Sequence, residues 1–510
     1  MLARVRTVAL EGIEASPVDV EVDLARGLPA LSVVGLPDSA VREAKDRVRS
    51  ALNNAGFSLP ARRITINLSP ADLPKSGAAY DLPIAVGLLV AMGRLDPASL
   101  GDALFLGELA LNGEIKPTTG CLPAALYARR QGLAGLFVPP ANAAETALVP
   151  GPWVRAPDTL TALVAHLLGE APLTPFIQDS VWETGTVAGH GVIPDMADVK
   201  GQEYARRALE VAAAGGHNLL MTGPPGSGKT FLARCVPGIL PPLTLDEALE
   251  VTAIYSISGL LGEKQPLVRL RPFRSPHHTA SQVALIGGSS TPRPGEVSLA
   301  HRGVLFLDEI PEFNRGTLEV LREPLEAGRV TISRAARSGT FPARFQLIAA
   351  CNPCPCGYLG DPTHHCRCAD SAVMRYRSRL SGPLLDRIDL HVEVPAVPME
   401  SLISAPAGET SAMVRQRVQG AWDIQFLRNG GGRLNRDLEG AELDRAVDLD
   451  AAGRGLLVQA GRQMGFSARA FHRLLRVART LADLEGGGPV ALHHLAEAVQ
   501  YRVAGRFGAE

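Results

Sequence analysis

The sequence lacks a long apolar segment. Its longest uncharged apolar stretch, residues 82–93, includes Pro83 and is too short to span a bilayer. The first residues include acidic side chains in place of the apolar core of a signal peptide. We therefore expect a cytoplasmic protein without membrane contacts.

Net charge is almost absent as well. The formal charge is −1 at pH 7 over 510 residues, and 46% of the residues are hydrophobic. This balance excludes a uniformly basic protein that coats nucleic acid, so any nucleic-acid contact must be concentrated at a local basic site. The length is sufficient for about three globular domains.

Cysteine is scarce but clustered. Seven cysteines are too few for a disulfide scaffold, yet five of them fall between Cys351 and Cys368. Two Cys-x-Cys pairs offer four thiolates for a tetrahedral, structural zinc site: Cys354, Cys356, Cys366 and Cys368. Cys351 with Cys354 is a competing pair, His364 or His365 could replace one thiolate, and the alternative is a set of reduced cysteines without metal.

The chain does contain a complete phosphate-binding loop. Residues 223–230 read GPPGSGKT, which fits the pattern Gly, four residues, Gly-Lys-Ser/Thr. An apolar run at 218–222 predicts the preceding strand, and 231–236 predicts the following helix. Its glycines allow a tight turn that points backbone N–H groups at phosphate. The predicted nucleotide contacts are Gly223, Pro224, Pro225, Gly226, Ser227, Gly228, Lys229 and Thr230.

A second motif supplies the acids. Residues 303–309 read GVLFLDE, a buried strand that ends in Asp308 and Glu309. We expect Lys229 to reach the β- and γ-phosphates of ATP, and Thr230 and Asp308 to hold Mg²⁺. Glu309 would polarise the attacking water. Together the motifs predict a nucleoside triphosphate hydrolase.

Residues 1–170 predict an α/β domain without a phosphate-binding loop. Short apolar runs at 31–34, 64–68, 103–106 and 135–138 alternate with helical stretches such as 39–55. The region resembles the Lon-protease-like domain, of the ribosomal S5 domain 2-like fold, that also closes RadA-type recombination ATPases and opens magnesium-chelatase-like proteins. The matching stretches are LPKSGAAYDLPIA and GELALNGEIKPTTG.

Proteases with this domain use a serine and a lysine. In this sequence the corresponding positions hold Ala79 and Leu122, and residues 117–128 contain no lysine. The resemblance therefore implies a domain without proteolytic activity. We interpret Ser76 and Lys75 as turn residues, because a nucleophile needs its base within hydrogen-bond reach.

Between the two nucleotide motifs the chain is longer than a simple connection requires. The segments 271–279 and 285–296 predict an inserted loop in which Arg274, His277, His278 and Arg293 contact a phosphate backbone, or else a solvated or intersubunit loop. After Glu309 we expect a helix at 315–327, then strands at 330–333 and 340–350 joined by a turn at 335–339. The hairpin carries four candidate DNA contacts, with a solvated basic turn as the alternative: Arg329, Arg334, Arg337 and Arg344.

Seven segments together resemble the YifB family of magnesium-chelatase-like AAA+ ATPases. They read VKGQ, GHNLLMTGPPGSGKT, FRSPHHT, PRPGEVSLAHRGVLFLDEIPEF, NPCPCGYLGD, CRC and SGPLLDRIDLHVEVP, and the likeness covers nearly the whole chain. It implies a hexameric, ATP-driven helicase that promotes branch migration on single-stranded or branched DNA during natural transformation, with recombination proteins as candidate partners. The alternatives are a magnesium-chelatase motor subunit and a regulatory ATPase with a protein-binding N-terminal domain.

The resemblance also implies a division of the chain and further site residues. A linker at 171–195 would separate the N-terminal domain from an AAA+ core at 196–400 and a helical lid at 401–510, with a helix at 204–214 following VKGQ. Asn352 would sense the γ-phosphate, Arg387 would reach a neighbour's nucleotide, and Arg469 would be the lid's sensor. For Arg473 and Arg476 on the same lid helix, we expect a solvated basic face.

Overall fold

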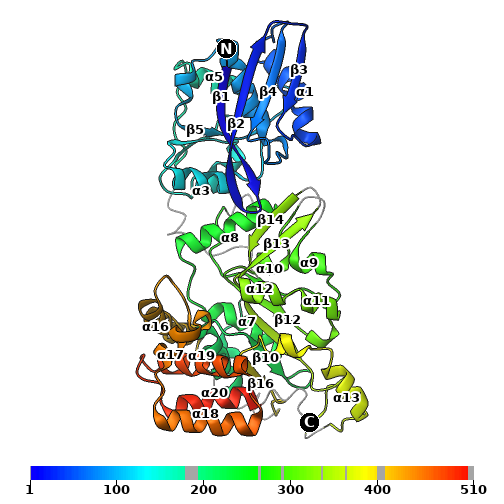
Figure 1. Cartoon of the computed structure of the whole chain (residues 1–510), viewed down its shortest axis with the longest axis vertical. Coiled ribbons are helices and arrows are strands. Elements are labelled where there is room, and N and C mark those ends of the chain that lie inside the picture. The colour runs from blue at the N-terminus through cyan, green and yellow to red at the C-terminus, as the bar shows by residue number, and fades with distance from the viewer. Residues whose placement is uncertain are drawn as a thin grey trace.

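The computed structural model describes residues 2–177, 193–261, 266–288, 292–334, 337–361, 364–398 and 408–503. In Figure 1 the N-terminal domain lies at one end, the P-loop domain in the middle and a helical domain at the other end. Most of the expected linker, and the turn between the hairpin strands, lie outside the described residues. No helix in the described ranges is long and apolar enough to cross a bilayer.

The N-terminal domain contains two small sheets and the two-stranded pair of β6 (Glu108–Leu109) and β7 (Ile115–Lys116). The first has the order β1-β2-β4-β3, with β3 parallel to β4: β1 (Leu2–Glu11), β2 (Glu14–Ala25), β3 (Ala30–Val34) and β4 (Arg63–Ser69). The second is parallel, with the order β5-β8-β9: β5 (Ala103–Phe105), β8 (Gly135–Phe137) and β9 (Trp153–Arg155). The helices are α1 (Ser39–Asn54), α2 (Asp81–Ala91), α3 (Cys121–Gln131), α4 (Ala143–Thr146) and α5 (Leu160–Leu167). The four predicted strands and the predicted helix at 39–55 are confirmed to within two residues.

The P-loop domain contains a five-stranded parallel sheet in the order β11-β12-β15-β10-β16. The strands are β10 (Leu219–Thr222), β11 (Phe273–Arg274), β12 (Val304–Leu307), β15 (Gln346–Cys351) and β16 (Leu390–Glu393). Every residue of β12 and β15 is buried, as expected for parallel strands covered on both faces. The carboxyl ends of parallel strands meet at one edge, so the P-loop after β10, Asp308 after β12 and Asn352 after β15 come together. Helix α6 (Glu203–Gly215) precedes β10, and α7 (Lys229–Ile239) follows the P-loop.

Two predicted elements of this domain are wrong in their bounds. The helix expected at 315–327 is two short helices, α11 (Arg315–Glu319) and α12 (Arg322–Ala327). Pro324 explains the break, because its ring would clash with the carbonyl group four residues earlier in a continuous helix. The strand expected at 340–350 is also two strands: β14 (Arg337–Pro342) pairs antiparallel with β13 (Arg329–Arg334), and β15 then joins the central sheet.

The segment inserted between the two nucleotide motifs packs against the N-terminal domain. Helix α8 (Leu245–Ile257) starts with a capping box between Thr244 and Glu247, and it lies beside α3 in Figure 1. A shared hydrophobic core includes residues of both helices. The rest of the insert holds α9 (Gln282–Ile286) and α10 (Glu296–Leu299). At a second contact, a Cβ on Gly12 in the β1–β2 turn would lie 2.1 Å from the Thr340 carbonyl oxygen in β14, so the two backbones touch.

The C-terminal domain is helical and packs on the P-loop domain. Its helices are α16 (Ser411–Asn429), α17 (Gly440–Val447), α18 (Ala451–Met464), α19 (Ala468–Leu484) and α20 (Leu492–Val503). The Trp422 indole N–H donates to the Ala213 carbonyl at 3.0 Å, and the Gln425 amide donates to Ala214 at 2.8 Å. These bonds attach α16 to the end of α6. Two further short helices, α13 (Asp370–Arg377) and α14 (Gly382–Leu385), belong to the P-loop domain.

Candidate nucleotide site

The P-loop wraps around its own lysine. Lys229 is 8% exposed, and its Nζ donates to the carbonyl oxygens of Gly223 and Pro224 at 2.7 and 2.8 Å. Burial lowers the pKa of Lys229. Gly226 and Gly228 have φ values of +76° and +92° with open space where a Cβ would stand. The left-handed backbone therefore favours glycine at both positions.

A hydroxyl group and a carboxylate meet beside the P-loop. The Thr230 Oγ1 donates to Asp308 Oδ2 at 2.7 Å. The backbone N–H of Glu309 donates to Asp308 Oδ1 at 2.9 Å, and Glu309 has φ of +49°, so the chain turns sharply after the strand. Hydroxyl and carboxylate oxygens are the ligands that magnesium prefers. The residues present therefore fit a magnesium ion that accompanies a nucleoside triphosphate.

The residue after β15 completes the candidate nucleotide site. Asn352 follows β15, and its Oδ1 accepts a hydrogen bond from Lys229 Nζ at 3.3 Å. His278 Nδ1 lies 3.7 Å from Glu309 Oε2. The sequence placed His278 among candidate backbone contacts, but the structure places it beside the acid proposed to polarise water. The P-loop lysine, the two acids, Asn352 and His278 thus form one site.

Gln202 is a site residue whose contacts the sequence did not reveal. It lies at the start of α6 with φ of +59°, and its side-chain amide donates to Pro395 O at 2.6 Å and Ser227 O at 3.3 Å. It therefore ties the P-loop to the segment leaving β16. The VKGQ motif marked this position, but its sequence alone resembles an ordinary polar turn.

The basic residues of the insert and hairpin have separate environments. Arg274 forms two hydrogen bonds with Glu296, at 2.6 and 2.7 Å, so its guanidinium already has an acidic partner. Arg293 lines a cavity of about 860 Å³ between the N-terminal domain and the insert. Arg329, at the start of β13, and Arg344, just beyond the end of β14, are exposed, whereas the side chains of Arg334 and Arg337 lie outside what the structure describes.

A second polar cavity lies at the opposite edge of the sheet, next to Asn218 before β10 and Asp389 before β16. It measures about 680 Å³ and is lined by seven arginines: Arg344, Arg387, Arg433, Arg436, Arg469, Arg473 and Arg476. We call it the arginine cavity. Since the P-loop follows the carboxyl end of β10, the cavity is separated from it by the length of the strand, about 13 Å at 3.3 Å per residue.

The arginine cavity brings Arg387 and Arg469 together. Arg387 is 5% exposed; it pairs with Glu326 and donates to Pro383 O at 2.6 Å. Arg469 stands exposed at the start of α19, after the N-cap Ser467. Neither lies beside the P-loop of its own chain.

The expectation of a solvated basic face on α19 is wrong. Arg473 donates to Asp389 Oδ1 at 2.6 Å, and the Nε of Arg476 donates to the Leu438 carbonyl at 2.7 Å. Their side chains are 16% and 14% exposed. Both point inward because Asp389, just before β16, and the Leu438 carbonyl, just before α17, accept their hydrogen bonds.

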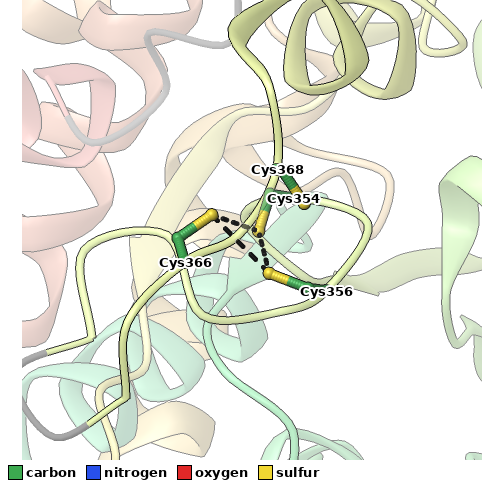
Figure 2. A group of neighbouring side chains, drawn as sticks. All are labelled: Cys354, Cys356, Cys366 and Cys368. Carbon is green, nitrogen blue, oxygen red and sulfur yellow. Dashed lines mark hydrogen bonds between the residues drawn. The ribbon is translucent and has the colours of Figure 1, made fainter.

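Four cysteine sulfurs converge in the loop after Asn352. Figure 2 shows the side chains of Cys354, Cys356, Cys366 and Cys368 gathered around one point. All four sulfurs lie within 4.8 Å of one another, and three pairs are 3.4, 3.6 and 3.7 Å apart. Tetrahedral zinc with bonds of about 2.3 Å separates its thiolates by about 3.8 Å, which is close to these distances.

The competing ligands lie elsewhere. Cys351 is buried in β15, with its Sγ 3.4 Å from the Thr222 hydroxyl. His364 Nδ1 lies 3.5 Å from Asp361 Oδ1. Neither His364 nor His365 is among the residues whose ligand atoms meet in the four-cysteine cluster. Backbone N–H groups of Tyr358 and Arg367 lower the pKa of Cys356 to about 6, whereas desolvation and hydrogen bonds to neighbouring cysteines raise the pKa of Cys366 and of Cys368.

The N-terminal domain keeps no protease pair at the expected positions. Ala79 lies in a short 3₁₀ turn and Leu122 is fully buried in α3. Lys75 is fully buried, unlike the turn residue expected from the sequence, and its ammonium donates to the Pro70 carbonyl. Ser76 is exposed.

In the central sheet, β15 lies between the P-loop strand β10 and the acid-bearing strand β12. The polar residue Asn352 follows β15. Together with the P-loop and the helical C-terminal domain, this arrangement is typical of AAA+ proteins. Family models specify the magnesium-chelatase-like class: the magnesium chelatase subunit ChlI models match residues 195–402 and 20–142, and the ChlI C-terminal model matches 408–502.

Whole-chain relatives narrow the class. The chain is 47% identical to "Uncharacterized protein YifB" of Salmonella typhimurium, over 99% of this chain and 98% of that protein. It is 46% identical to "Competence protein ComM" of Haemophilus influenzae, over 98% and 97% of the two chains. A magnesium-chelatase 38 kDa subunit of Cereibacter sphaeroides is 24% identical over 58% of this chain and 87% of its own. The chain belongs to the YifB and ComM family of magnesium-chelatase-like proteins.

Proposed function

We propose that the protein hydrolyses ATP and uses the energy to drive branch migration of DNA during homologous recombination in natural transformation. The observation that carries the ATPase proposal is the meeting of Lys229, Asn352, Thr230 and Asp308 at one edge of the sheet. The relative ComM is named as a competence protein, and it matches this chain along nearly its whole length. The magnesium-chelatase subunit matches little more than half of the chain.

The residues divide the reaction among them. Lys229 binds the β- and γ-phosphates, and P-loop backbone N–H groups orient them. Thr230 and Asp308 hold magnesium, which neutralises charge on the phosphates when bound. Glu309 accepts a proton from the attacking water, and Asn352 orients the water or the γ-phosphate. His278 lies close enough to Glu309 to restrain its carboxylate.

The arginine cavity supplies the second half of each site from a neighbouring subunit. Arg387 and Arg469 line one cavity, at the sheet edge opposite their own P-loop. In a closed ring with head-to-tail contacts, one edge of each subunit faces the opposite edge of the next. We therefore propose a ring, a hexamer by family resemblance, in which both arginines contact the neighbour's nucleotide.

The remaining regions are assigned to DNA and to the scaffold. We propose that Arg329, Arg334 and Arg337 of the β13–β14 hairpin contact single-stranded or branched DNA in the ring channel. Arg344, the fourth candidate, lies beyond β14 and lines the arginine cavity, so it is assigned to that cavity. The N-terminal domain has the Lon-like fold without its protease pair, and the C-terminal helices form the lid. Recombination proteins are the expected partners of such a motor.

An ATPase assay with different DNA structures tests this function. We expect four-way or forked DNA to raise the turnover of ATP by several-fold over protein alone, with weaker stimulation by duplex. Equal turnover with and without every DNA would contradict the DNA motor. That result would favour a magnesium-chelatase-like motor or a regulatory ATPase with a protein-binding N-terminal domain.

We also propose that the four-cysteine cluster binds a structural zinc ion. The four thiolates leave no open coordination position for a substrate. Protein purified without an affinity tag should contain about one zinc per chain, because the site offers one tetrahedral set of ligands. Replacing Cys366 and Cys368 with serine should remove it, whereas Cys121→Ala, in the distant N-terminal domain, should not. Active protein with almost no zinc would contradict the site.

A further inference from the structure

The cysteine loop touches the P-loop. Gly357 follows the proposed ligand Cys356 and has φ of +85°. A Cβ on Gly357 would lie 2.6 Å from Cδ and 2.8 Å from Cγ of Pro225. The ring of Pro225 therefore rests against the Gly357 backbone with no room for a side chain between them.

Pro225 lies in the middle of the phosphate-binding turn. The neighbouring Gly226 and Gly228 have no atom within 4 Å of a Cβ position, so no side chain covers the turn at those two points. From outside the motif, Gln202 donates to the Ser227 carbonyl and Gly357 packs on Pro225. The shape of the turn thus depends on neighbours distant in sequence.

The position of Gly357 depends in turn on the cysteine cluster. The N–H of Gly357 donates to the Cys354 carbonyl at 3.0 Å, so Gly357 closes the tight turn that carries the proposed ligands Cys354 and Cys356. The described residues of the loop between β15 and α13 contain no helix or strand that could hold it. A metal ion that binds both ends of such a loop removes most of its conformational freedom.

We propose that the metal-bound cysteine loop positions the P-loop, so that tight binding of ATP requires the metal. Gly357 is the positioning residue, acting on the nucleotide through Pro225. This inference rests on the proposed nucleotide and zinc sites. It gives the cysteine cluster a role in ATP binding in addition to stabilising its own loop.

Two glycines of the same loop provide a matched test. Gly357→Ala and Gly360→Ala each place a side chain at a left-handed backbone, with φ of +85° and +81°, but only the first meets Pro225, because Gly360 has open space. Both variants should keep about one zinc per chain. We expect Gly357→Ala to weaken binding of a fluorescent non-hydrolysable ATP analogue at least about fivefold, since overpacking shifts the neighbouring turn, with Gly360→Ala close to the parental affinity.

Two further measurements connect the contact to the metal. Cys366→Ser with Cys368→Ser should lose zinc and lose affinity for the analogue by at least as much as Gly357→Ala. Adding Pro225→Ala to Gly357→Ala should cost less than the sum of the separate losses, because the two residues act through one contact. Near-additive losses would overturn the contact as the cause.

The outcomes separate the inference from its premises. Equal analogue affinity of Gly357→Ala and Gly360→Ala would overturn the positioning role while leaving the ATPase intact. Parental protein that binds the analogue tightly without zinc would overturn the metal requirement. Parental protein that fails to bind the analogue at all would overturn the proposed nucleotide site together with the inference.

Discussion

Lys229→Ala is expected to reduce ATP turnover by about 10²–10³-fold or more, the usual cost of removing one charged contact to a developing transition-state charge. The ammonium of Lys229 donates to two P-loop carbonyl groups and to Asn352, and we expect it to bind the phosphates when the nucleotide is present. Steady-state phosphate release measures the effect. Lys45→Ala, an exposed lysine on α1 in the N-terminal domain, is the control and should turn over at the parental rate.

Glu309→Gln separates binding from chemistry at the same site. The amide keeps the shape of the carboxylate but cannot accept a proton from water, so this variant should bind ATP and fail to hydrolyse it. Retention of radiolabelled ATP on gel filtration, against release by the parental protein, provides the measurement. Parental turnover in Lys229→Ala would show that residues 223–230 do not bind the nucleotide.

The residues of the nucleotide site could be predicted because most of them belong to two short, contiguous sequence motifs. The pattern at 223–230 fixes a strand, a turn and a helix in order, and the apolar run before Asp308 fixes another strand. Parallel strands bring their carboxyl ends to one edge, so the proximity of Thr230 and Asp308 follows from the two strands alone. The cysteine spacing likewise predicted which sulfurs come together.

Contacts between distant segments were not predictable in this way. Arg473 and Arg476 form a regular stripe on α19, and a stripe of arginines usually faces water. Only the packing of α19 beside Asp389, at the amino end of β16, and beside the segment before α17 that holds the Leu438 carbonyl shows where the two side chains bind. The contact of Gly357 with Pro225 was not predictable either. In the sequence, a glycine that leaves space for a proline ring cannot be distinguished from a glycine that is needed for a turn.

Arg387→Ala should bind ATP normally and lose most of its hydrolysis, because Arg387 and the P-loop of the same chain lie at opposite edges of the sheet. An arginine supplied in trans is worth about 10³–10⁵ in turnover where it has been measured in related chemistry. Loss of Arg387 therefore stops every site in a uniform ring, although each P-loop is intact. Arg469→Ala, from the same cavity, should affect turnover in the same direction.

Mixing two inactive variants tests the trans arrangement directly. In rings assembled from equal amounts of Arg387→Ala and Lys229→Ala, about a quarter of the interfaces should pair an intact P-loop with an intact Arg387, if subunits mix at random around the ring. We expect ATPase activity to reappear at those interfaces and to peak near equal mixing. Lys229→Ala mixed with Glu309→Gln is the matched control: Lys229 and Glu309 serve the same P-loop, so no site in that mixture has both. Absence of recovery in the first mixture, with co-assembly shown by pull-down of differently tagged subunits, would place Arg387 outside the neighbour's site. Recovery in the control mixture would show instead that Glu309 acts across the interface.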